Sequence, residues 1–174
     1  MQVLLDEQEI GRLIHKLAVS ITASVGESGD LALVGIRSRG DILAQRLQRI
    51  LQEKGYGRID RGTLDITLYR DDLNSMGHQQ PKLQSTEIDF SVDDRMIVLV
   101  DDVLNTGRST RAAMEALIAL GRPRCIRLAV LIDRGERELP IRADYVGKVM
   151  EVPPDRRVQV YLKERDGRDE VGLG

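Results

Sequence analysis

The chain has 174 residues, of which 41% are hydrophobic, and its 28 acidic and 26 basic side chains give a net charge of −2. This length fits one domain with a substantial core, while the near balance of charge excludes attraction to nucleic acid by net charge alone. No apolar run approaches the ~20 residues that a membrane span requires and no signal peptide is visible, so a cytoplasmic protein without membrane contact is expected.

Helical and strand patterns alternate along the first half of the chain. Asp6 can cap a helix, and apolar residues at helical spacing extend that helix to about Val25. The apolar run Leu31–Ile36 predicts a short buried strand, and Asp41 opens a second helix. Residues 64–69 are predicted to form the next strand.

The second half continues this alternation. The polar stretch of about 70–88 has no helical or strand period, which is typical of a lid loop. The continuously apolar run 96–100 predicts a buried parallel strand. A helix from about 110 to 120, a strand that begins near Cys125 with this thiol packed in the core, and a last strand pair within 145–162 complete the chain. The alternation predicts an α/β fold with a central, mostly parallel sheet flanked by helices.

Two carboxylates and a loop suited to an anion follow the strand at 96–100. Asp101 and Asp102 fall at its carboxyl end, where open α/β sheets bind ligands. The stretch 105–110 then supplies a glycine, three hydroxyl groups and the free amides of a helix start, which suit a phosphate. Because carboxylates repel phosphate, we expect them to bind sugar hydroxyls or a metal. A ribose 5-phosphate offers both kinds of partner.

These residues resemble the signature of the type I phosphoribosyltransferases, and most closely that of the PyrR family. The segments that carry the resemblance are LDEQEI near the start, DITLYRDD from Asp65, VLVDDVLNTGRST from Val98 and LAVLIDRGERELPIRADYVGK from Leu128. The resemblance implies a type I phosphoribosyltransferase fold in a single domain, 1–174, with a lid at about 70–88 and a small C-terminal hood from about 134 to 174.

The resemblance also implies two functions. One is uracil phosphoribosyltransferase activity, in which uracil and phosphoribosyl pyrophosphate (PRPP) form UMP and diphosphate. The other is binding of pyrimidine operon leader messenger RNA in response to UMP or UTP, as a transcriptional attenuator. An alternative stays open, in which the chain is a catalytically weak RNA-binding regulator that uses the fold as a nucleotide sensor. A homodimer or higher oligomer is the family expectation.

The resemblance assigns catalytic roles to two acids and two arginines. Asp101 and Asp102 would bind the ribose hydroxyls and stabilise an oxocarbenium-like transition state, while Arg39 and Arg70 would balance the charge of the leaving diphosphate. Mg²⁺ is the implied cofactor, held mainly by the substrate and without an assigned protein ligand. The implied PRPP contacts are Ser38, Arg39, Gly40, Asp101, Asp102, Val103, Leu104, Asn105, Thr106, Gly107, Arg108, Ser109 and Thr110.

Uracil and RNA are assigned to other parts of the chain. Arg134 and backbone groups near Val158, in the hood, are the implied uracil contacts. The RNA candidates are His15, Arg137, Arg142 and Lys148, with Arg12 and Lys16 beside them on the first helix.

Two positions depart from the family pattern. Glu136 stands where RNA-binding relatives commonly have a histidine, and an acid there would repel RNA phosphate. Asn105 stands where the family usually has an aromatic residue, and its side chain still suits a turn.

Two other protein classes are excluded. Too few residues follow Asp102 for a phosphorylation-receiver domain, in which an acid pair lies near the start. A P-loop nucleotidase would need a Gly-Lys-Ser or Gly-Lys-Thr sequence, and the chain contains neither.

Overall fold

The computed structural model describes residues 1–26, 29–71 and 85–174. Its main sheet has five strands in the order β3-β2-β4-β5-β6, and every neighbouring pair is parallel. The predicted α/β fold with a central parallel sheet is thereby confirmed. These strands are β2 (Leu31–Ile36), β3 (Asp60–Leu64), β4 (Met96–Leu104), β5 (Cys125–Asp133) and β6 (Tyr145–Val149).

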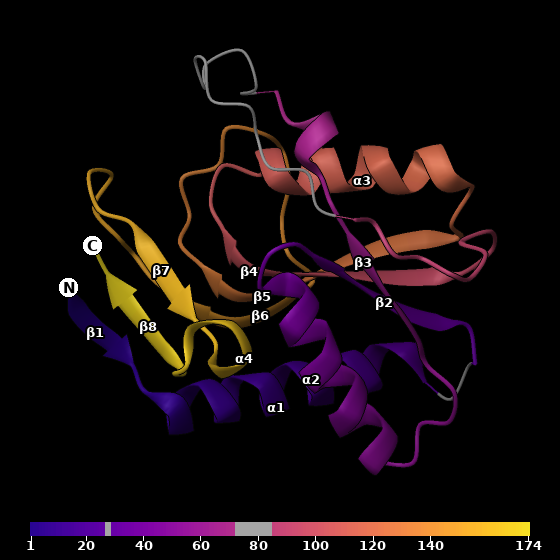
Figure 1. Cartoon of the computed structure of the whole chain (residues 1–174), viewed down its shortest axis with the longest axis horizontal. Coiled ribbons are helices and arrows are strands. Elements are labelled where there is room, and N and C mark those ends of the chain that lie inside the picture. Colours follow the sequence, from indigo (N-terminus) through magenta and orange to yellow (C-terminus); the bar gives the residue numbers. More distant parts are fainter. Residues whose placement is uncertain (27–28, 72–84) are drawn as a thin grey trace.

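Helices cover both faces of this sheet (Figure 1). Apolar residues of α1 (Glu7–Val25) and α2 (Gly40–Glu53) pack in one core cluster, and those of α3 (Arg108–Leu120) pack in a second cluster on the other face. Asp6 caps α1 as predicted, because its carboxylate accepts the Glu9 N–H at 2.8 Å while the Glu9 carboxylate accepts the Asp6 N–H. Cys125 lies half-buried against the first cluster.

A second, antiparallel sheet combines both ends of the chain. Its order is β1-β8-β7, so the N-terminal β1 (Gln2–Leu5) pairs with β8 (Glu170–Leu173), which also pairs with β7 (Val158–Tyr161). The two termini therefore lie together at this small sheet (Figure 1). A short helix, α4 (Lys163–Asp166), joins β7 to β8. We call the small sheet and α4 the hood.

Two strands lie within 145–162, as predicted, but they do not pair with each other. β6 pairs with β5 in the main sheet, whereas β7 belongs to the hood. Pro153 and Pro154 lie in the connection between them, and proline lacks the N–H that a strand ladder needs. Neither β1 nor β8 was predicted, because four residues are too few to establish a strand period.

The strand predicted at 64–69 lies earlier, as β3, and is followed by the 3₁₀ helix η1 (Thr67–Tyr69). The Asp65 carboxylate accepts the Thr67 N–H at 2.9 Å and also the Thr67 hydroxyl, which turns the chain out of the sheet. Most of the expected lid, 72–84, lies outside the described residues. Among the helices described, none has the length and apolarity to cross a bilayer.

Candidate active site

The two acids lie on β4, just beyond the point where the neighbouring strand β2 ends. β2 pairs with β4 only as far as the Gly35–Val100 pair, whereas β5 pairs with β4 beyond that point, as far as Leu104. Asp101 and Asp102 therefore remain in the strand after its neighbour β2 has ended at Ile36. This places both carboxylates at the carboxyl edge of the sheet, as predicted.

Asp101 is buried and Asp102 is half-buried. Asp101 is only 8% exposed, and one of its oxygens accepts the Asp102 N–H at 2.9 Å. Burial raises the pKa of Asp101 well above its ordinary value, and the charge of Asp102 raises it further. Burial also raises the pKa of Asp102, although the Val103 N–H and the charge of Arg39 oppose the shift. A cation or a developing positive charge at this position would oppose these shifts and favour the ionised form of the pair.

The loop before α2 packs directly on the acid-bearing strand. A Cβ added at Gly40 would lie 2.3 Å from the Val100 carbonyl oxygen and 3.2 Å from the Asp101 Cα, so only glycine permits this approach. Arg39 precedes it with φ +83°, a left-handed conformation. Gly40 thus packs against the acid-bearing strand, and the charge of Arg39 reaches Asp102. The Arg39 N–H donates to the Asp41 carboxylate at 2.9 Å.

A second loop joins β4 to α3. Gly107 takes a left-handed conformation with φ +92° immediately before α3, which begins at Arg108, two residues earlier than predicted. The Thr106 hydroxyl accepts the Arg108 N–H at 3.3 Å. A cavity of about 180 Å³ opens beside the loop, and we call it the phosphate cavity. Its lining residues are Arg70, Asp71, Thr106, Arg108 and Ser109.

Three predicted phosphate or diphosphate ligands take unexpected places. Arg70 lines the phosphate cavity beside Thr106 and Ser109, rather than the loop that contains Arg39. Thr110 is only 3% exposed, so its side chain is buried and adds no accessible hydroxyl. The exposed guanidinium of Arg108 pairs with Glu138 at 2.7 Å and Asp71 at 2.6 Å, and hydrogen bonds from both carboxylates raise its pKa.

The comparisons with known proteins agree with this geometry. A model described as the phosphoribosyl transferase domain matches residues 2–161. The Bifunctional protein PyrR of Pelotomaculum thermopropionicum is 50% identical over 168 residues, which cover 97% of this chain and 92% of that protein. The protein of the same name from Deinococcus radiodurans is 49% identical over 170 residues, which cover 98% and 92%. The chain belongs to the PyrR family of phosphoribosyltransferases.

Solved structures support the fold. A hypoxanthine phosphoribosyltransferase of Trypanosoma cruzi matches with a TM-score of 0.72 at 18% identity and covers 99% of this chain and 95% of its own. One from Staphylococcus aureus matches with a TM-score of 0.69 at 22% identity and covers 98% and 90%. This PyrR-family chain therefore has the type I phosphoribosyltransferase fold, as predicted.

The candidate uracil residues lie where the hood meets the main sheet. The Arg134 N–H donates to the Leu104 carbonyl at 3.0 Å, which joins the ends of β5 and β4. The Arg134 side chain is 6% exposed and donates to the Arg156 carbonyl at 2.8 Å and to the Glu136 carboxylate at 2.7 Å. Its buried Nε has no acceptor among the described residues. Val158 begins β7 and is half-buried. Glu136, the departure from the family pattern, therefore neutralises a buried arginine.

Arg137 points inward rather than toward solvent. Its guanidinium donates to the Asn105 carbonyl at 2.9 Å, to the Ile141 carbonyl at 2.8 Å and to the Asp133 carboxylate at 2.6 Å. Two further backbone bonds, from the N–H groups of Glu138 and Leu139 to the Thr106 carbonyl, hold the same loop. Arg137 thus anchors the loop that borders the phosphate cavity, a role that its sequence position gave no means of predicting.

The remaining RNA candidates divide between two faces. Lys16 on α1 donates to the Gly147 carbonyl at 2.9 Å, next to the exposed Lys148 on the edge strand β6. His15 and Arg12 are exposed on the same helix. Arg142 instead lines a cavity with Thr110 and Met114 of α3, on the opposite face of the sheet. We call the set Arg12, His15, Lys16 and Lys148 the α1–β6 face.

No metal site preformed by protein ligands was found among the described residues. Within 1–26, 29–71 and 85–174, no three or more His, Cys, Asp or Glu side chains gather closely enough to hold an ion. Asp101 and Asp102 supply carboxylate oxygens near the end of β4, beside the loop that contains Gly40. This donor set fits an ion that arrives with hydroxyl and diphosphate oxygens of its own.

Proposed function

We propose that this chain transfers the ribose 5-phosphate group of PRPP to uracil, which yields UMP and diphosphate. The observation that carries the proposal is the Asp101–Asp102 pair near the end of β4, next to two glycine-containing loops, in a PyrR-family chain. The phosphate cavity would take the 5-phosphate, and the loop with Arg39 would take the diphosphate. A substrate that carries phosphate at both ends of a ribose fits between them.

The two acids would act through charge. As the bond from the sugar to the diphosphate breaks, positive charge develops on the ribose ring. Carboxylates in a buried setting stabilise that charge more strongly than exposed ones would, because little water screens them. Asp101 and Asp102 would also accept hydrogen bonds from the ribose 2- and 3-hydroxyls, which fixes the sugar between the loops.

The departing diphosphate needs positive charge on its other side. Arg39 is our candidate for this charge, since its guanidinium acts electrostatically on Asp102. We further propose that Mg²⁺ binds together with PRPP and balances the charge of the diphosphate. Arg70, beside Thr106 and Ser109, would neutralise the 5-phosphate instead.

Uracil would bind at the junction of the hood and the main sheet. The buried, unpaired Nε of Arg134 is a donor suited to a base carbonyl. The backbone near Val158 would supply the remaining partners. A base with the wrong pattern of donors and acceptors would leave one of these buried groups unpaired, which is a strong source of selectivity.

The test of this proposal is the formation of UMP from labelled uracil by the purified protein. We expect product only when PRPP and Mg²⁺ are both present, and loss of product when EDTA is added. If the complete mixture gives no UMP, the chain would instead be the catalytically weak regulator.

A second proposed function is the binding of pyrimidine leader RNA in response to UMP or UTP. The α1–β6 face supports it, because Arg12, His15, Lys16 and Lys148 lie on neighbouring elements there. Among the described residues, none of these four side chains forms an ion pair with an acid. Such a cluster suits phosphate groups of an RNA backbone. Glu136 is turned to Arg134, so its charge is already balanced and need not repel RNA.

The RNA proposal is tested by titrating the protein with its own leader transcript, with and without UMP. Replacing Lys148 by Ala should weaken binding and reduce the slope of log affinity against log salt by about one. Replacing Arg142 by Ala, on the other face, should have less effect. Equal effects of the two changes would contradict the proposal that RNA binds the α1–β6 face.

We also propose that the chain acts in the cytoplasm as a homodimer or larger oligomer, which light scattering would test.

A further inference from the structure

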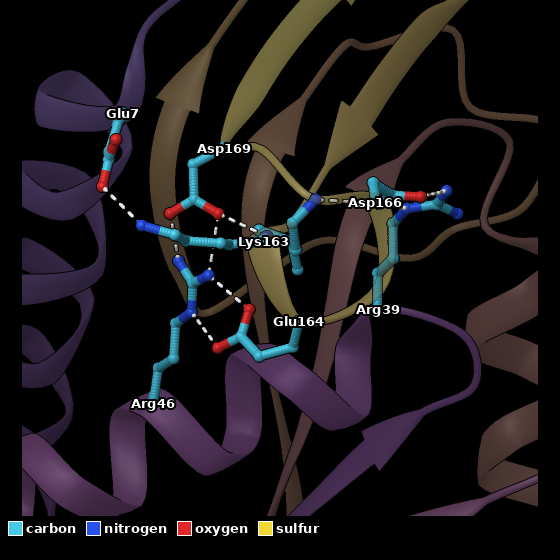
Figure 2. A network of polar contacts seen from close by, with 8 residues as sticks. Glu7, Arg39, Arg46, Lys163, Glu164, Asp166 and Asp169 are labelled. Atoms are coloured by element: carbon cyan, nitrogen blue, oxygen red, sulfur yellow. Dashed lines mark hydrogen bonds and ion pairs between the residues drawn. The ribbon is translucent and has the colours of Figure 1, made fainter.

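The guanidinium of Arg39 is held by an acid from the hood, 127 positions away in the chain. Its Nε donates to one oxygen of Asp166 at 3.1 Å, and its Nη2 donates to the other oxygen at 3.0 Å (Figure 2). Both side chains are largely buried, at 25% and 15% exposure. This is a two-point contact, which fixes the plane of the guanidinium as well as its position.

Asp166 is itself firmly placed. One of its oxygens also accepts the Leu162 N–H at 2.8 Å, which closes the turn of α4. Arg46 on α2 donates to Glu164 on the same short helix at 2.9 Å and to Asp169 just after it at 2.7 Å (Figure 2). The segment 162–169 is thereby tied to α2, the helix that directly follows Arg39.

The contact with Asp166 uses one edge of the guanidinium and leaves the other available. Asp166 takes the edge formed by Nε and Nη2. No described residue accepts a hydrogen bond from Nη1, so the edge formed by Nη1 and the second N–H of Nη2 remains available. A phosphate group binds such an edge with two parallel hydrogen bonds. The backbone is fixed as well, because the Arg39 N–H donates to Asp41 at 2.9 Å.

We propose that Asp166 is a positioning residue, which holds Arg39 so that its free Nη1 edge faces the diphosphate of PRPP. The inference rests on the proposed phosphoribosyl transfer. Asp166 would not touch the substrate. Because Asp166 already restricts the Arg39 side chain, less conformational entropy would be lost when diphosphate binds. A smaller entropy loss improves both affinity and rate.

The test compares Asp166→Asn with wild type in UMP formation and in binding of diphosphate by calorimetry. Asparagine keeps an acceptor for the Leu162 N–H but removes the charge and the second oxygen that hold Arg39. We expect kcat/KM for PRPP to fall about tenfold and diphosphate affinity to fall by a similar factor, with an unchanged KM for uracil. Asp166→Glu keeps both oxygens and should recover part of the loss.

Two controls separate positioning from general damage to the hood. Glu164→Gln removes a neighbouring ion pair of the same helix without touching Arg39, and it should leave diphosphate affinity near the wild-type value. In an Arg39→Ala background, Asp166→Asn should cause no further loss, because the two residues act as a unit. A full additional tenfold loss in that background would show that Asp166 acts elsewhere.

Binding and turnover distinguish the failure of this inference from failure of the proposed function. If wild type binds diphosphate and Asp166→Asn binds it more tightly, Asp166 competes for Arg39 and the inference is overturned. Unchanged affinity in Asp166→Asn would overturn it too, even if wild type makes UMP. A wild type that makes no UMP but binds diphosphate in an Asp166-dependent way would refute the proposed activity alone. No binding of diphosphate to wild type would overturn both.

Discussion

Gly40 determines how closely the loop with Arg39 approaches the two acids. An alanine there would press its Cβ to 2.3 Å from a backbone oxygen of β4, which cannot yield as a side chain could. We expect Gly40→Ala to lower the free energy of unfolding by about 1–3 kcal/mol and to reduce turnover strongly. Urea unfolding and UMP formation would measure both effects.

Gly11 on α1 is the matched control for this change, because a Cβ added there meets nothing within 4 Å. Gly11→Ala should raise stability by about 0.5–1 kcal/mol, as expected for the loss of a glycine from a helix interior. If both variants changed the free energy of unfolding alike, the close contact at Gly40 would not be what makes glycine necessary there.

Asp102 is the second test at the residue scale. Asp102→Asn keeps the shape of the side chain and removes its charge, so turnover should fall by about 10²-fold or more while the fold is retained. Glu53→Gln, at an exposed end of α2, is the control and should keep wild-type turnover. Near-normal turnover of the Asp102 variant would remove this carboxylate from the proposed role.

The sequence was most informative for residues whose role depends on their immediate neighbours. The acids, Gly40 and Gly107 could be predicted because a strand end and a tight turn are local features. Arg39 was predicted as a ligand, but its bond to Asp166 joins segments far apart and has no local signal. The surroundings of Arg70 could not be predicted for the same reason, since they come from α3 and the preceding loop.

At the scale of elements, Arg137 connects the segment after β5 with the loop before α3. Arg137→Ala should free this loop, so we expect the KM for PRPP to rise about tenfold and stability to fall by about 1–3 kcal/mol. Steady-state kinetics with varied PRPP would show the first effect, and thermal unfolding the second. Arg142→Ala, an exposed neighbour, should change neither quantity. A loss of RNA affinity with unchanged KM would instead make Arg137 an RNA contact.

Long elements with a clear period were predicted well, and short ones were not. Asp6 and the spacing of apolar residues predicted both ends of α1 to within one residue, and the continuous apolar run predicted β4. β1 and β8 are stable only because they pair with each other, so their four-residue sequences carry little information. The strand predicted at 64–69 extended too far because the β-branched residues after Asp65 favour a strand. The turn that the Asp65 side chain forms ends β3 before them.

At the scale of the whole molecule, Arg46 joins the hood to α2 through Glu164 and Asp169 (Figure 2). Although burial opposes it, hydrogen bonds from Arg46 and the Lys163 N–H hold the pKa of Asp169 below its ordinary value. The Arg46 hydrogen bond lowers the pKa of Glu164 as well. Lowered carboxylate pKa values stabilise the folded state above the unfolded pKa of about 4, and this stabilisation is lost as the pH falls below it.

We therefore expect Arg46→Met to lower the free energy of unfolding by about 3 kcal/mol at pH 7, because Asp169, with its side chain 8% exposed, is left without its cation. The difference from wild type should shrink as the pH falls from 5 toward 3. Denaturant unfolding across this range would measure it. Arg58→Met, at a guanidinium 89% exposed, should cost less than about 1 kcal/mol at any pH. A pH-independent deficit for Arg46→Met would indicate lost packing rather than lost charge.

The central claim is that this PyrR-family chain is a phosphoribosyltransferase selective for uracil. The most direct measurement gives the wild-type protein equal amounts of uracil, orotate, hypoxanthine and adenine with PRPP and Mg²⁺ in one reaction, and identifies the nucleotides formed. We expect UMP as the dominant product. Formation of a purine nucleotide or of orotidine monophosphate in greater amount, or of no nucleotide, would contradict it.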